Sequence, residues 1–90
     1  MSEVRNNEER SQFELDVDGH VARAEYALEG DVVVFTHTVV PQALQGQGIG
    51  SRLIAGALAQ VRAAGRSVDP QCSFVARYLA QHPEWQDLRA

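Results

Sequence analysis

The sequence predicts a mixed α/β domain, in which an antiparallel meander of strands is followed by one β-α-β crossover and a C-terminal helix. Between residues 13 and 28, apolar and polar residues alternate with the period of half-buried strands. After a glycine-rich stretch at residues 45–50, the apolar period changes to that of a helix. Because 90 residues hold one core only, we expect a flexible N-terminal arm at residues 1–10 and a single domain at residues 11–90.

Three strands are expected in the first half of the chain. Residues 13–17 alternate between apolar and acidic side chains, and Asp18-Gly19 is a strong two-residue hairpin signal. Residues 22–28 place apolar side chains at every second position, and a turn follows at residues 29–31. The next run, residues 32–40, is apolar on both faces at its start, which is typical of a central strand.

Helices are expected in the second half. Residues 53–61 carry one apolar stripe, and Gly65 is suited to end that helix. Residues 66–69 form a short strand that should lie parallel to the strand at 32–40 in a right-handed crossover. A second helix follows and ends before Pro83, and its apolar stripe consists of Phe74, Val75, Tyr78 and Leu79.

Charge and composition exclude several classes of protein. The net charge is −4, which argues against non-specific binding of nucleic acid, and residues 46–90 carry five Arg against three acidic residues. No apolar run is long enough to span a membrane, and residues 1–10 lack the features of a signal peptide. One cysteine, Cys72, allows neither an internal disulfide nor a four-cysteine zinc site. We expect a cytoplasmic protein without a metal, as a monomer or weak dimer.

The glycine-rich loop is a candidate anion site. Gly46, Gly48 and Gly50 allow the backbone to curl so that amide groups converge, and the loop leads into a helix N-terminus. The glycines alone leave two interpretations open, a diphosphate cradle or a tight connecting turn. The spacing differs from the dinucleotide-binding fingerprint, and the chain has no Lys for a P-loop.

A family resemblance favours the diphosphate cradle. Gln45-x-x-Gly48-x-Gly50 resembles the pyrophosphate-binding motif of the GNAT superfamily of N-acetyltransferases, and its position between a long strand and a helix also matches. Together with residues 37–41, 70–74 and 82–84, the motif looks like the small single-domain branch of GNAT-like proteins. The resemblance extends from Phe13 to Leu88.

The resemblance implies acetyl-CoA as co-substrate and an amine as acceptor, which attacks the thioester directly. The acceptor amine would belong to a peptide, a protein or a small molecule. The strands at 32–40 and 66–69 are expected to splay apart and leave a slot for the pantetheine arm. The implied cofactor-binding residues are Thr38, Val39, Val40, Gln45, Gly46, Gln47, Gly48, Ile49, Gly50 and Ser51.

Three residues are candidates for proton transfer. Many GNAT enzymes use a carboxylate on the long strand, but residues 32–40 contain none, which leaves Cys72, His37 and Tyr78. Cys72 precedes a helix, where the dipole lowers a thiol pKa, although a free cysteine is commonly a small buried hydrophobe. His37 is expected to share a strand face with Phe35, and Tyr78 lies on an apolar helical stripe typical of core packing.

Two other functions stay open at the level of sequence. The missing carboxylate and the small size favour a non-catalytic acyl-CoA-binding or regulatory module. A structural domain whose glycine loop binds nothing is the third possibility.

Overall fold

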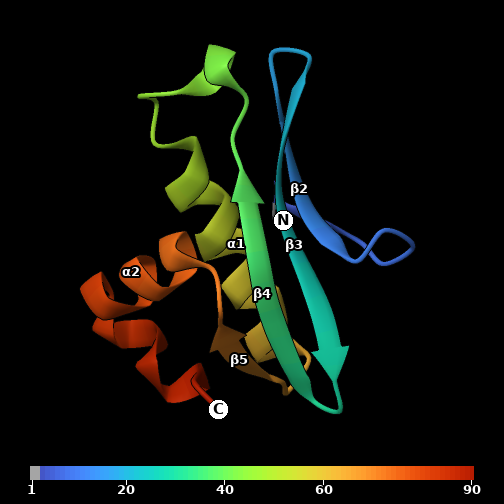
Figure 1. The fold of residues 1–90 in the computed structure, drawn as a ribbon, viewed down its shortest axis with the longest axis vertical. Coiled ribbons are helices and arrows are strands. Elements are labelled where there is room, and N and C mark those ends of the chain that lie inside the picture. Colours follow the sequence, from blue (N-terminus) through green and yellow to red (C-terminus); the bar gives the residue numbers. More distant parts are fainter. Residues whose placement is uncertain (1–2) are drawn as a thin grey trace.

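The computed structural model describes residues 3–90 as one sheet with two helices and two short 3₁₀ segments (Figure 1). The sheet has the strand order β1-β2-β3-β4-β5. In chain order the elements are β1 (Arg5–Asn7), β2 (Gln12–Val17), β3 (His20–Glu29), β4 (Val32–Val39), η1 (Gln42–Leu44), α1 (Ile49–Ala63), β5 (Ser67–Pro70), α2 (Ser73–Gln81) and η2 (Pro83–Leu88).

The predicted topology is confirmed. β1 to β4 pair as antiparallel neighbours, and β5 pairs with β4 in parallel after the chain has crossed over through α1. Asp18-Gly19 forms the expected turn, with both residues at positive φ. The C-terminus closes the outer side of β5, because the backbone N–H of Ala90 donates to the carbonyl of Val68 over 2.9 Å.

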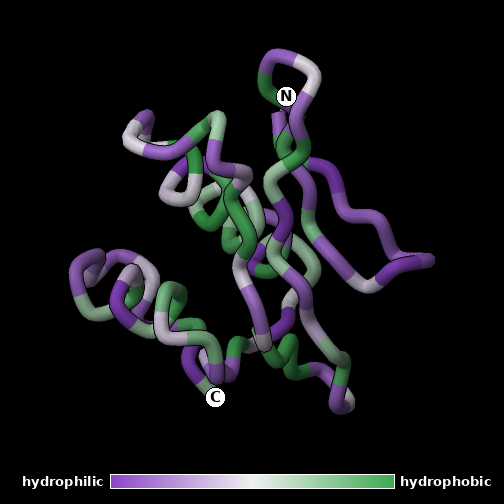
Figure 2. The backbone as a smooth tube through the Cα atoms, turned by 45° about the horizontal axis from the view of Figure 1, so that its top comes forward, coloured by the Kyte–Doolittle hydropathy of each residue, from purple (hydrophilic) through white to green (hydrophobic). Residues whose placement is uncertain are grey.

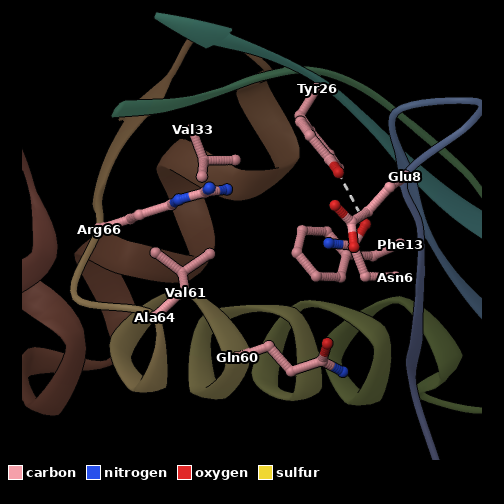
Figure 3. Close-up of a pocket in the computed structure, with 9 residues that line it drawn as sticks. All are labelled: Asn6, Glu8, Phe13, Tyr26, Val33, Gln60, Val61, Ala64 and Arg66. Carbon is pink, nitrogen blue, oxygen red and sulfur yellow. Dashed lines mark hydrogen bonds between the residues drawn. The ribbon is translucent and has the colours of Figure 1, made fainter. Parts of the chain in front are cut away.

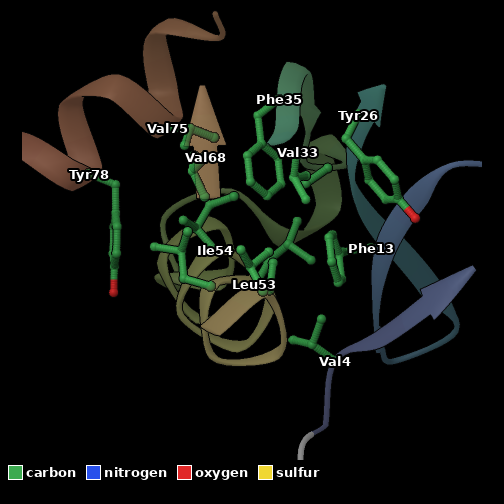
Figure 4. Close-up of a cluster of buried hydrophobic side chains, with 14 of the residues drawn as sticks. Val4, Phe13, Tyr26, Val33, Phe35, Leu53, Ile54, Val68, Val75 and Tyr78 are labelled. Carbon is green, nitrogen blue, oxygen red and sulfur yellow. The ribbon is translucent and has the colours of Figure 1, made fainter. Parts of the chain in front are cut away.

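The core lies between the sheet and α1. Leu53 and Ile54 project from α1 into the space between Phe35 on the sheet and Val75 on α2 (Figure 4). These side chains are fully buried, as the helical stripe predicts. Figure 1 shows α1 behind the sheet and α2 beside β5, so neither helix covers the front face of β2, β3 and β4.

The prediction of an arm at residues 1–10 is wrong for the part that carries β1. Arg5–Asn7 pair with β2, the side chain of Val4 is 2% exposed, and Tyr26 donates a hydrogen bond to Asn6 Oδ1 over 2.7 Å. A strand of three polar residues is too short to show a period, so only its sheet partner defines it. Figure 2 shows the hydrophilic loop that joins β1 to β2. Residues 1 and 2 of the expected arm lie outside the described residues.

Burial of Val4 predicts a measurable effect on stability. Val4→Ala should lower the free energy of unfolding by about 1–2 kcal/mol, because it removes apolar surface from a closed core. Glu9→Ala, at an exposed position of the β1–β2 loop, is the matched control and should change stability by less than about 0.5 kcal/mol. Urea unfolding measures both free energies. Equal stability of the two variants would favour the prediction that this segment is a flexible arm.

Candidate functional site

The glycine loop forms an open cradle at the N-terminus of α1. Gly46 and Gly48 adopt left-handed backbone conformations, with φ of 80° and 70°, and Gly48 is the residue that precedes the helix. No side chain caps this helix end, so the first amides of α1, those of Ile49, Gly50 and Ser51, have no partner within the helix. These amides and the helix dipole favour an anion at this end.

Two glutamines hold the loop in place rather than face a ligand. Gln45 Nε2 donates to the carbonyl of Val40 over 2.8 Å, and Gln47 Nε2 donates to the carbonyl of Ala43 over 3.4 Å. Both side chains therefore tie the loop to the segment that follows β4. Of the predicted cofactor-binding residues, Gln45 and Gln47 are positioned to shape the loop with their side chains, and Gln47 retains its backbone for binding.

Phe74 on α2 closes one side of this cradle. Its place on the apolar stripe of the helix predicts only a core position. A Cβ atom added to Gly50 would lie 2.6 Å from Phe74 Cζ, so the absence of a side chain at Gly50 makes room for the ring. The Phe74 side chain is 37% exposed and lines a cavity of about 180 Å³ with Val40, Gly48 and Ser51. The cradle therefore has one aromatic wall.

β5 ends at Pro70, part-way along β4. Their parallel register runs from Val32↔Ser67 to Phe35↔Pro70, and there the carbonyl of Phe35 accepts hydrogen bonds from the amides of Gln71 and Cys72, over 3.0 and 2.9 Å. Beyond this point the chain turns into α2, so β4 residues after Phe35 have no partner on β5 within residues 3–90. The expected splay of the two strands is not seen, because all of β5, Ser67–Pro70, pairs with β4. The later part of β4 is unpaired on this side because β5 ends.

Residues 12–88 match the sequence profile of the family described as GCN5-related N-acetyl-transferase. The chain belongs to this family. Its fold is also similar to the NMR solution structure of a GCN5-like protein from Staphylococcus aureus, with a TM-score of 0.75 and 23% sequence identity. That likeness covers 99% of this chain and 88% of the other, and at this identity it shows the fold. The GNAT fold expected from the four sequence blocks is confirmed, and the chain is an N-acetyltransferase.

Cys72 of this N-acetyltransferase lies between the end of β5 and the start of α2. Its half-buried Sγ is 3.3 Å from Thr38 Oγ1, and the residue directly precedes α2. Burial opposes ionisation of the thiol, but the Thr38 hydroxyl and the backbone groups of Phe74 and Val75 outweigh it. The pKa of Cys72 therefore lies below its ordinary value.

His37 does not share a face with Phe35, contrary to the sequence prediction. His37 pairs with Glu25 whereas Phe35 pairs with Tyr26, and Thr36 between them is the extra residue of a β-bulge. Adjacent residues on β3 point to opposite faces, so His37 lies on the face away from α1. Its side chain is 73% exposed, and Nδ1 is 3.7 Å from Glu25 Oε1.

Glu25 is a site candidate that the sequence reasoning missed. It lies on β3, whereas the carboxylate of many GNAT enzymes lies on the long strand, which is residues 32–40 here. Arg23 Nε donates to Glu25 Oε2 over 2.8 Å. No signal in the sequence alone links Glu25 with His37, because the bulge at Thr36 sets which residues face each other.

The structure does not bring Tyr78 to this site. The Tyr78 ring is 8% exposed and stacks on His82, with ring centroids 3.9 Å apart. Figure 4 shows Tyr78 on α2, at the edge of the buried cluster to which it belongs. Burial and the nearby Glu84 carboxylate raise the pKa of Tyr78, against an opposing contribution from Trp85. Its surroundings favour the packing role over the acid role.

Neither a membrane-spanning helix nor a metal-ligand cluster is found in the described part of the chain. No helix among residues 3–90 is long and apolar enough to cross a bilayer. Those residues also contain no group of three or more His, Cys, Asp or Glu side chains placed to hold a metal ion.

The contact between Thr38 and Cys72 predicts how the thiol titrates. Thr38→Val removes the hydroxyl that favours the thiolate, so the pKa of Cys72 should rise and alkylation by iodoacetamide should need a higher pH. Thr36→Val is the control, since the Thr36 hydroxyl donates to the carbonyl of Glu25 instead. The pH dependence of the alkylation rate measures this, and an unchanged midpoint in Thr38→Val would contradict it.

Proposed function

We propose that this N-acetyltransferase moves the acetyl group of acetyl-CoA to an amine by direct attack on the thioester. The observation that carries the proposal is that α2 joins two features at its first turn. Phe74 forms a wall of the glycine cradle, and Cys72, two residues earlier, contacts Thr38 on the part of β4 that lies beyond the end of β5. One extended ligand with an anionic end and a reactive thioester end suits this arrangement.

The glycine cradle is assigned to the diphosphate. The amides of Gln47 to Ser51 and the dipole of α1 favour its negative charge, and left-handed glycines leave the backbone open to close approach. The stretch of β4 without a β5 partner is assigned to the pantetheine arm. The arm would form hydrogen bonds with the backbone of residues 38–40, as a neighbouring strand does.

Cys72 is assigned to the leaving group. When the amine attacks the thioester carbon, the C–S bond to CoA breaks and the departing thiolate requires a proton. The Cys72 thiol supplies it and becomes a thiolate, which the Thr38 hydroxyl and the first turn of α2 stabilise. Because Tyr78 is packed against His82, the thiol is better placed for this step.

His37 is assigned to the amine. The acceptor must lose a proton to become a nucleophile, and His37 is exposed on the open face of β4, one residue before Thr38. Glu25 lies beside its ring and would stabilise the imidazolium that forms. Because direct attack requires contact between the amine and the thioester carbon on the Cys72 side, the amine proton would reach His37 through water around the edge of β4 that β5 leaves unpaired.

The cradle is tested by a pair of matched variants. Gly48→Val should weaken CoA binding by at least about tenfold, because a side chain and a strained backbone disturb the amides that would hold the diphosphate. Gly65→Val at the other end of α1 is matched, since Gly65 has φ of 71° and no heavy atom within 4 Å of an added Cβ, as at Gly48. Calorimetric titration with CoA measures both affinities. Equal affinities would contradict the assignment of the diphosphate to the cradle.

The acid is tested by turnover. Cys72→Ala should lower kcat by about 10²-fold with little change in CoA affinity, because the proton is needed only as the C–S bond breaks. Tyr78→Phe keeps the ring packed on His82 and should leave kcat within about twofold. Acetylated amines are measured by mass spectrometry from a panel of peptides and small amines. The reverse pattern would return the acid role to Tyr78.

The base is tested with the two exposed histidines. His37→Gln should lower kcat/KM by about 10²-fold at neutral pH, because the amine then loses its proton acceptor. His20→Gln, at the exposed first residue of β3, is the control and should be neutral. If both variants retain full kcat/KM, the amine reacts without His37.

A further inference from the structure

A second cavity lies at the opposite end of α1 from the glycine cradle (Figure 3). Its volume is about 220 Å³, and it is bounded by the last turns of α1, the start of β4 and the N-terminal strand. Gly50 and Val61 are separated by eleven residues of α1, about 16 Å along the helix. A molecule in this cavity would therefore not overlap the diphosphate or the thioester of acetyl-CoA.

The floor of the cavity is apolar and rigid. Phe13, Val33 and Val61 line it with side chains that are at most 3% exposed, and Tyr26 adds a second ring. Tyr26 is held in place by its hydrogen bond to Asn6 and by the Phe13 ring, whose centroid lies 5.2 Å away. Because these groups already belong to the core, the shape of the cavity exists before any ligand binds.

Arg66 supplies an unpaired charge at this cavity. Its side chain reaches into the space beside Val33 and Val61, as Figure 3 shows. Within residues 3–90, the guanidinium group forms no hydrogen bond and no ion pair, although the residue is half-buried. The other charged residue of the lining, Glu8, is exposed, so water solvates its carboxylate. A half-buried guanidinium without a partner favours an anion that brings its own acceptor oxygens.

We infer that this cavity is a second binding site, for a small carboxylate with an apolar body of about one ring. The carboxylate pairs with Arg66, and the apolar body lies on Phe13, Tyr26 and Val33. The modest volume limits the ligand to this size, since typical drug-sized sites are larger. The inference is independent of the acetyl-transfer proposal, because it uses none of the residues assigned to that reaction.

The test uses 3-phenylpropanoate as the probe and the uncharged 3-phenylpropanamide as its isostere. In NMR titrations of the whole chain, the acid should saturably shift the backbone amides of Val33, Ala64 and Arg66. The amide should bind at least about tenfold more weakly, because it lacks the charge that Arg66 prefers. Arg66→Gln should weaken the acid by a similar factor, whereas Arg77→Gln, an exposed arginine on α2, should not.

Each other outcome overturns the inference. If millimolar probe causes no saturable shifts, the cavity does not bind such a ligand. If acid and amide bind equally well, Arg66 does not recognise the carboxylate. Shifts centred on residues 46–51 would place the probe in the glycine cradle instead. CoA titration of Arg66→Gln verifies the fold, since that variant should bind CoA as the unmodified chain does.

Discussion

The carbonyl of Phe35 is the constraint on which the site depends. It accepts hydrogen bonds from the backbone amides of both Gln71 and Cys72. This pair of hydrogen bonds ends the β4–β5 ladder. Because the chain then turns directly into α2, the first turn of that helix is brought to the part of β4 that lies beyond the end of β5. Without this arrangement β5 would continue along β4, and the stretch from Thr38 to Val40 would have no room for a ligand.

The bulge at Thr36 has the complementary effect on the other edge of β4. It shifts the register against β3, so His37 faces Glu25 and Thr38 faces Ala24. Thr38 then lies on the α1 side with Cys72, whereas His37 lies on the uncovered face. One extra residue therefore places Thr38 and Cys72 on one side of β4 and His37 and Glu25 on the other.

Charge is distributed in agreement with this division. The cradle is formed by backbone amides and glycines, so an anion there would be held by main-chain groups. On the face away from α1, the carboxylates of Glu14 and Asp16 pair with Arg5, and that of Glu25 pairs with Arg23.

The sequence by itself determined β2 to β5, both helices, their order and the position of the glycine loop. Periodicity placed both helices, Asp18-Gly19 placed a hairpin, and the run of glycines placed the loop, because each is a local property of a few consecutive residues. Tertiary structure decided what local patterns do not contain. Arg5–Asn7 form a strand because they pair with β2, and the bulge at Thr36 places His37 on the face opposite to Phe35. The absence of a side chain at Gly50 leaves room for the Phe74 ring beside the cradle. Tyr78 packs on His82 for the same reason, since the helix face that a residue buries depends on its neighbours in space.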